Sequence, residues 1–327
     1  MQIIKSLRKY DLALIAASVV IFAVLEVLID MRLISSFWRL QIILIGINII
    51  LAASLNLING ITGQFSLGHA GFMAVGAYVS AIMSMWYDLP FGLALLIGGL
   101  AACIIGVLIG IPTLRLDGDY LAIATLGMGE IIRICILNIQ AVGGASGLTG
   151  IPRNTTFAWV FWIMIITLFF LKNMINSTYG RSCISVRENA IAAAAMGINT
   201  TFAKVLAFAI GAFFAGLAGG LFSHYFSIAH PSSFTFLNSY NYLTMVVLGG
   251  LGSMTGSITG VALITFITAA LADYPEVRMI IYALCLILLM LFRPQGLFGS
   301  QEGSLLLRRI INRRKEAGNH GKTLGNQ

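Results

Sequence analysis

Apolar runs of about twenty residues recur along nearly the whole chain, and they limit its fold more than any other feature. A helix needs about 20 apolar residues to cross the ~30 Å hydrocarbon core of a bilayer, whereas the strands of membrane barrels have about ten alternating residues. Only 10% of the 327 residues are charged, against roughly 25% in soluble domains. The sequence therefore predicts an all-α polytopic membrane protein.

Hydropathy predicts about ten membrane-spanning helices. The first follows basic residues, but it is longer than a signal-peptide core, contains Glu26 and is followed by no small-residue cleavage site, so we expect a retained anchor. The sixth and eighth are the weakest, being short or polar at one end. The expected spans are residues 12–29, 41–58, 70–87, 91–112, 119–139, 157–173, 203–222, 240–253, 257–272 and 277–292.

Lysine and arginine are unevenly distributed between the two sides that these spans define. Fifteen fall on one side and four on the other, with Arg133 inside a span, and the positive-inside rule places the richer side in the cytoplasm. We therefore expect both termini in the cytoplasm, a transmembrane domain over 1–299 and a basic, disordered tail over 300–327. The net charge of +8 then reflects orientation and attraction to anionic lipid rather than nucleic-acid binding. The inner residues are Lys5, Arg8, Lys9, Arg115, Lys172, Arg181, Arg187, Lys204, Arg293, Arg308, Arg309, Arg313, Arg314, Lys315 and Lys322, and the outer ones are Arg32, Arg39, Arg153 and Arg278.

The segment 180–199 is predicted to form a short cytoplasmic helix between two spans. Ser185 and Glu188 have the spacing of a capping box, and Gly197 suits the left-handed position that ends a helix. The helix, near 185–197, is too short to cross a membrane, and its small alanine side chains suit docking into a groove on a partner. An ordinary connecting helix is the alternative. The residues assigned to partner contact are Arg181, Ser185, Arg187, Glu188, Ala193, Ala194 and Gly197.

No motif for nucleotide, metal or catalytic chemistry is present in the sequence. The glycine-rich stretch 249–256 lacks the lysine and the spacing of a phosphate-binding loop, so ATP-driven transport would need a nucleotide site on another subunit. The four cysteines have no metal-ligand spacing, and no nucleophile, base and orienting group come together. We therefore expect a transporter with no cofactor in this chain rather than an enzyme.

Two polar features fall within the apolar part of the chain. The segment 59–69 contains Gln64, Ser66 and His69, and such backbone at membrane depth is tolerated where it is buried in protein or lines a watery cavity. It predicts a broken helix beside a transport path, with a plain loop as the alternative. Glu130 and Arg133 are three residues apart, so they can pair on one helical face, with direct contact to substrate as the alternative.

The loop 143–152 is rich in glycine and lies on the predicted outer side. Its residues Gly143, Gly144, Ser146 and Gly147 could face an external protein, although most glycine-rich loops are only turns.

Six segments taken in order resemble the LivM-type permeases of branched-chain amino-acid ABC transporters. They are SLGHAGFMAVGAY (66–78), RLDGDYLAIATLGMGEIIR (115–133), GGASGLTGIP (143–152), RENAIAAAAMGIN (187–199), MVVLGGLGSMTGSITG (245–260) and LFRPQGLFG (291–299). The resemblance implies a fold similar to the vitamin B12-type (type II) ABC importer permease. It also implies a homologous second permease, two cytoplasmic ATPases and an extracytoplasmic binding protein as partners, with 187–199 as the coupling helix.

The function that this resemblance implies is ATP-driven import of Leu, Ile, Val or related amino acids across the bacterial cytoplasmic (inner) membrane. Residues 1–299 are then the permease domain. An importer of urea or short amides is the nearest alternative. An ion-coupled secondary transporter would need intramembrane carboxylates, for which Glu26 and Glu130 are the candidates.

Overall fold

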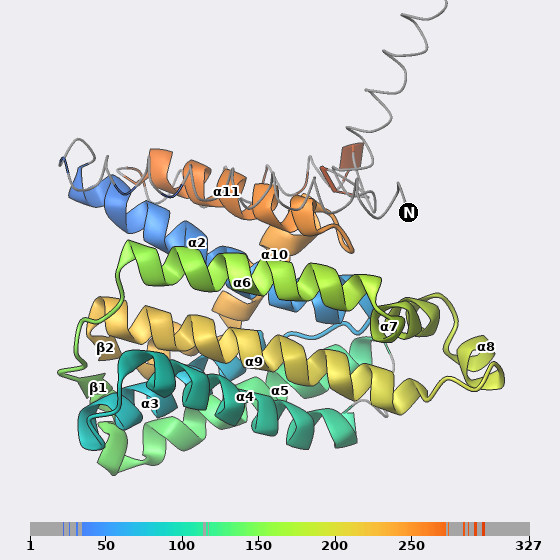
Figure 1. Ribbon diagram of the computed structural model, residues 1–327, viewed down its shortest axis with the longest axis horizontal. Coiled ribbons are helices and arrows are strands. Elements are labelled where there is room, and N and C mark those ends of the chain that lie inside the picture. The colour runs from blue at the N-terminus through green and yellow to red at the C-terminus, as the bar shows by residue number, and fades with distance from the viewer. Residues whose placement is uncertain are drawn as a thin grey trace, which may run out of the picture.

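The computed structural model describes residues 35–113, 116 and 118–272, together with isolated residues 22, 26, 31, 274, 284, 287, 291, 292, 296 and 297. The described chain is a bundle of helices with one pair of two-residue strands (Figure 1). The helices are α2 (Ser36–Asn56), α3 (His69–Trp86), α4 (Phe91–Thr113), α5 (Asp119–Asn138), α6 (Phe157–Asn176), α7 (Thr178–Glu188), α8 (Ala190–Ala195), α9 (Thr200–Phe226), α10 (Phe236–Gly249) and α11 (Met254–Ala270). The π-helical turn η1 (Leu57–Ile61) continues α2, the 3₁₀ turns are η2 (Gln140–Val142), η3 (Gly144–Ser146) and η4 (Pro231–Phe234), and β1 (Leu148–Thr149) pairs antiparallel with β2 (Ile228–Ala229).

Five helices in the described ranges are long and apolar enough to cross a membrane: Ser36–Ile61, Phe91–Thr113, Asp119–Asn138, Phe157–Asn176 and Thr200–Phe226. Helices α10 and α11 make a sixth candidate only as a pair, bent by 119° at a short break. The eighth and ninth expected spans are the two legs of this pair. The third corresponds to α3, which is not among these five. The first and tenth are described only at isolated residues, and the tail lies outside the described residues. The polytopic helical class is confirmed, while the count of ten stays a prediction.

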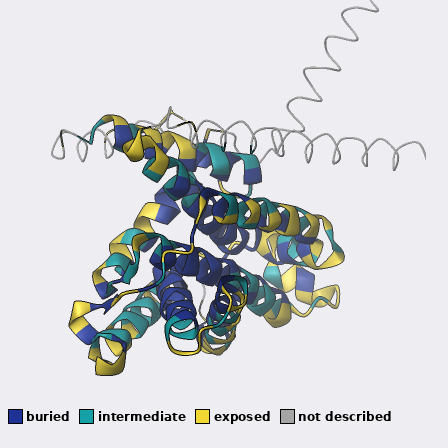
Figure 2. Ribbon diagram, turned by 60° about the vertical axis from the view of Figure 1, so that its left-hand side comes forward, coloured by how far each residue is buried: buried dark blue, intermediate teal, exposed yellow. Residues whose placement is uncertain are grey.

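The centre of the bundle is formed by α3, α4 and α9, whose backbones come into direct contact at glycines. A Cβ on Gly76 would collide with the backbone of Gly216, and one on Gly219 would collide with the carbonyl of Met73. Small residues allow such close approach between membrane helices, where packing and not apolar burial drives association. Figure 2 shows the buried residues gathered at this centre and the exposed ones around it.

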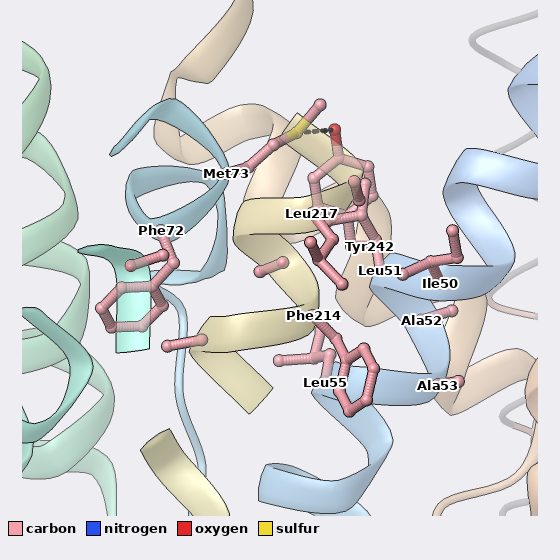
Figure 3. Close-up of a cluster of buried hydrophobic side chains, with 14 of the residues drawn as sticks. Ile50, Leu51, Ala52, Ala53, Leu55, Phe72, Met73, Phe214, Leu217 and Tyr242 are labelled. Atoms are coloured by element: carbon pink, nitrogen blue, oxygen red, sulfur yellow. Dashed lines mark hydrogen bonds between the residues drawn. The ribbon is translucent and has the colours of Figure 1, made fainter. Parts of the chain in front are cut away.

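A second layer of α2 and α10 packs against this centre. Figure 3 shows Leu51 and Leu55 of α2 beside Leu217 of α9, with Tyr242 of α10 directed at Met73 of α3. The Tyr242 hydroxyl donates to the Met73 sulfur at 3.3 Å. The packing holds α10 beside the start of α3, where the chain is irregular.

Candidate functional site

The non-spanning elements lie at opposite ends of the bundle. Helices α7 and α8 project at one end and strands β1 and β2 lie at the other (Figure 1). We call these the α7–α8 end and the β1–β2 end. The end of the second span reaches the α7–α8 end, because Gly60 of η1 accepts a hydrogen bond from Arg187 of α7.

The segment predicted to be one capped helix is two helices that meet at Asn189. Ser185 is not an N-cap: it lies inside α7, and its hydroxyl donates to the Arg181 carbonyl at 3.0 Å. A serine hydroxyl can bond the preceding turn when its helix continues, and this alternative prevails here. Asn189, with extended backbone, caps α8 by accepting from Ile191 N and Ala192 N, both at 3.0 Å. Asparagine before an alanine run is itself an N-cap signal, and it was missed.

The predicted end of this segment at Gly197 is confirmed. Gly197 has φ +83°, and its N–H donates to Ala194 O at 2.9 Å while Ile198 N donates to Ala193 O at 3.0 Å. These two bonds form the Schellman motif, which satisfies carbonyls that a helix end leaves open. The six residues of α8 thus have hydrogen-bonded caps at both ends.

The surface of α8 corrects the expectation that Ala193 and Ala194 share one free face. Ala193 is 5% exposed and packs against its own chain, whereas Ala194 is exposed. The largest apolar side chains, Ile191 and Met196, are 85% and 83% exposed. The exposed residues of α8 are therefore Ile191, Ala192, Ala194 and Ala195, and its C-cap Met196 is exposed beside them.

The basic residues of α7 make different contacts. Arg181 donates to Asn176 O and Thr178 Oγ1, and so ties α7 to the end of α6. Arg187 pairs with Glu188 at 2.7 Å and also donates to Gly60 O at 2.8 Å. On the buried side the Cys183 thiol donates to Ala203 O at 3.6 Å, and burial raises the pKa of that thiol.

The polar segment 59–69 contains a stretch of irregular backbone, called the break below, which lies between the second and third spans. Its place beside a transport path stays a prediction. After η1, residues 62–68 have no regular structure until α3 begins at His69. Asn59 holds η1 against residues 62–68, since its side chain donates to Ser66 O at 3.3 Å and accepts from Ser66 N at 3.2 Å. Thr125 Oγ1 of α5 accepts from Leu67 N, and Ser239 Oγ of α10 accepts from Ala70 N. The break is thus bonded to η1 and α5, and the start of α3 is bonded to α10.

Polar atoms of this break are buried without hydrogen bonds from the described residues. They are both amide atoms of Gln64, the Ser66 hydroxyl and Nδ1 of His69. His69 Nε2 lies 2.9 Å from Ser54 Oγ, which fixes the ring against α2. Because most buried polar groups in folded proteins are paired, such a cluster suits water or a polar ligand.

Glu130 and Arg133 form the predicted ion pair, with Arg133 Nε 2.7 Å from Glu130 Oε2. The other oxygen of Glu130 accepts from Phe236 N at 2.9 Å. Phe236 is the first residue of α10, and a carboxylate at a helix N-terminus satisfies a free N–H and interacts favourably with the helix dipole. The pair therefore connects α5 to α10, a contact that spacing on one helix could not reveal.

The glycine-rich loop at the β1–β2 end is held by backbone contacts. Gly143 and Gly147 have φ of +90° and +74°, and Ser146 ends the turn η3 between them. Leu148 and Thr149 pair with Ala229 and Ile228, and the Tyr78 hydroxyl donates to Ala229 O at 2.7 Å. This loop is a structured surface rather than a free turn.

The sequence model of one family, described as the branched-chain amino acid transport system permease component, matches residues 40–291. The chain belongs to this family. It is 35% identical over 297 residues to the high-affinity branched-chain amino acid transport system permease protein LivM of Salmonella typhimurium, and 36% identical to LivM of Escherichia coli; each alignment covers 80% of this chain and 70% of the relative. LivH of Salmonella typhimurium is 26% identical over 283 residues, which cover 77% of this chain and 91% of that protein. No solved structure matches.

Family membership confirms the resemblance to LivM-type permeases. The family is one of transport components and not of enzymes. The matched residues include the break at 62–68, the Glu130–Arg133 pair and the whole of α7 and α8.

Proposed function

We propose that the chain is the membrane permease subunit of an ATP-binding-cassette importer that carries Leu, Ile, Val or related amino acids across the bacterial cytoplasmic membrane. Family membership and the names of the relatives support the substrate class. The observation that carries the ATP-driven mechanism is α8, a capped helix outside the bundle with Ile191 and Met196 almost fully exposed. Exposed apolar side chains of this size mark an interaction site.

In this proposal α7 and α8 form the coupling segment, and one of two cytoplasmic ATPase subunits covers the exposed face of α8. ATP and Mg²⁺ are bound by those subunits. The contact with the ATPase includes the exposed side chain of Glu188 and the turn at Gly197, while Arg187 is bonded to its own chain at Gly60. A homologous second permease completes the membrane part, in a fold of the vitamin B12-type class. Both termini then lie in the cytoplasm.

An extracytoplasmic binding protein delivers the substrate at the β1–β2 end, over Gly143, Gly144, Ser146 and Gly147. That end is opposite to α8, as an importer requires (Figure 1). Its fixed backbone supports a constant docking surface, because less order has to be gained on binding.

The translocation path passes the break between the second and third spans. Gln64, Ser66 and His69 supply polar atoms without partners among the described residues, which can replace water around an amino acid's charged groups. Glu130 and Arg133 border the path through their contact with the start of α10.

Reconstitution tests the function. The chain, a second permease and the ATPases are placed in proteoliposomes with ATP inside and a binding protein outside. We expect uptake of labelled leucine that needs both ATP and the binding protein, and that unlabelled isoleucine or valine competes while urea does not. Uptake driven by an ion gradient without the ATPases would refute the proposal, and preference for urea would replace the substrate.

Labelling of single cysteines tests the orientation. In a cysteine-free background, a reagent that cannot cross the membrane should reach a cysteine at position 146 from outside and fail to reach one at position 318. Labelling of position 318 in intact cells would reverse the topology.

A further inference from the structure

The guanidinium of Arg187 joins α7 to the end of the second span. Its Nη1 donates to Gly60 O at 2.8 Å, while Nε and Nη2 donate to Oε1 of Glu188 at 3.1 and 2.7 Å. Gly60 lies in the last turn of the span Ser36–Ile61, where carbonyls lack helical partners and the dipole favours a cation. Arg187 is therefore both paired to its neighbour and bonded to the backbone at the end of the second span.

Two glycines leave room for this side chain. A Cβ on Gly63 would lie 2.6 Å from Cγ of Arg187, and a Cβ on Gly252 would lie 3.2 Å from its Nη1. Both glycines have left-handed backbone, with φ of +72° and +85°. The stem of Arg187 thus lies against the irregular segment 62–68, and its head lies beside the turn between α10 and α11.

Asn56 bonds the end of the second span to the turn between α10 and α11. Its Oδ1 accepts from Gly252 N at 2.8 Å, and its Nδ2 donates to Ser253 O at 3.0 Å. The side chain is fully buried, and a Cβ on Gly60 would collide with Asn56 Oδ1 and Gly252 N. The end of the second span and the α10–α11 turn therefore form one unit, and Arg187 connects this unit to α7.

We infer that Arg187 is a positioning residue for transport, which carries displacement of α7 and α8 to the break and to the α10–α11 turn at once. A charge-assisted hydrogen bond is strong enough to keep two elements together during a movement, and irregular backbone absorbs changes of φ and ψ that a helix cannot. Arg187 therefore acts on the membrane part of the chain rather than on the surface of a partner. The inference rests on the proposed function in that an ATPase is what moves α8.

The experiment measures the accessibility of residue 65, within the break, in the assembled complex. Phe65, 38% exposed within the break, is replaced by cysteine in a chain whose native cysteines are removed, and its labelling rate is compared between resting and vanadate-trapped ATPases. The chain carries arginine, glutamine or lysine at position 187. Arg39→Gln, a change at an exposed arginine at the far end of α2, controls for the loss of a positive charge.

With Arg187, we expect trapping to change the labelling rate at least about fivefold, the scale of coupling between sites. Arg187→Gln should abolish this response and lower uptake about tenfold, while the ATPases stay bound and hydrolyse ATP. Arg187→Lys should restore part of both, because an ammonium can reach Gly60 O but lacks the fork that also binds Glu188. Arg39→Gln should match the unmodified chain.

A normal labelling response and normal uptake in Arg187→Gln would overturn the inference. Loss of the ATPases from that variant alone would also overturn it, because Arg187 would then belong to the docking surface. Failure of the ATPases to bind the unmodified chain is a separate result: it refutes the proposed function and, with it, this inference.

Discussion

At the β1–β2 end Gly147 packs tightly against the backbone of Ala229, whereas at the α7–α8 end no other part of the described chain packs against Gly197. Both have left-handed backbone, with φ of +74° and +83°. A Cβ on Gly147 would lie 2.7 Å from Ala229 O, while no heavy atom of the described chain lies within 4 Å of one on Gly197. The β1–β2 end is closed by its own backbone contacts, and the α7–α8 end exposes Ile191 and Met196. The same residue type therefore serves packing at one end and only a turn at the other.

The largest effect is expected from charges on the exposed face of α8. Ile191→Asp or Ala194→Arg should weaken ATPase binding about a hundredfold, the scale of a binding hot spot, and leave the melting temperature of the chain unchanged. Binding of the purified ATPases to the solubilised permease measures this. Thr149→Asp, at an exposed position of β1, is the matched control and should bind normally.

Ala193→Arg is not suitable for this test, since Ala193 is buried against its own chain and the change would disturb α8 itself. Normal ATPase binding by Ile191→Asp and Ala194→Arg together would show that α8 is only a connector.

Gly147→Ala should cost about 3 kcal/mol or more of stability, because left-handed backbone strain adds to a steric collision in a packed site. A lowered melting temperature of the purified protein, with lost binding-protein docking, is the expected result. An unchanged melting temperature would mean that the β1–β2 end is as open as the other.

Variants of the ion pair in α5 test whether the close packing of the β1–β2 end extends to the contact between α5 and α10. Arg133→Gln should cost about 2 kcal/mol, because it leaves a carboxylate in a poorly solvated place. Glu130→Gln should be milder than Glu130→Ala, since the amide oxygen can still accept from Phe236 N. Stability of the three single variants and of the double variant Glu130→Gln/Arg133→Gln is the measurement. A double variant no better than the worse single one would favour a direct role in the path.

The smallest effect is expected from Gly197→Ala, which adds backbone strain of about 1 kcal/mol without a collision. The global melting temperature should stay constant, and hydrogen exchange of the α8 amides should become faster. A loss of stability as large as that of Gly147→Ala would remove the contrast between the two ends.

Local signals in the sequence predicted local structure well. The helix end at Gly197, the pairing of Glu130 with Arg133 and the irregular segment at 59–69 follow from backbone preference, helical spacing and polarity, which neighbouring residues determine. The prediction that Ser185 is an N-cap was wrong. Ser185 and Asn189 could each cap a helix, and α7 continues through Ser185 as it packs on α9, so that Asn189 caps α8.

Contacts between distant residues could not be predicted from one sequence. Arg187 and Gly60 are 127 residues apart, and Asn56 and Ser253 are 197 apart. No periodicity links such positions, so the sequence could not connect Arg187 with Gly60. The glycines at 60, 63 and 252 mark these contacts only once the structure has brought them together.

The glycine contacts at the centre of the bundle have a consequence for biosynthesis. Gly76 of α3 and Gly216 of α9 touch backbone to backbone, yet 140 positions separate them in the chain (216 less 76). Translation at about 5–20 residues per second leaves roughly 10 s between the synthesis of α3 and that of α9. During that interval α3 and α4 can meet at Gly98, which lies against the carbonyl of Gly76, but the surface that receives α9 stays open. The newly made N-terminal half is therefore an incomplete bundle in the bilayer until α9 is synthesised and packs against α3.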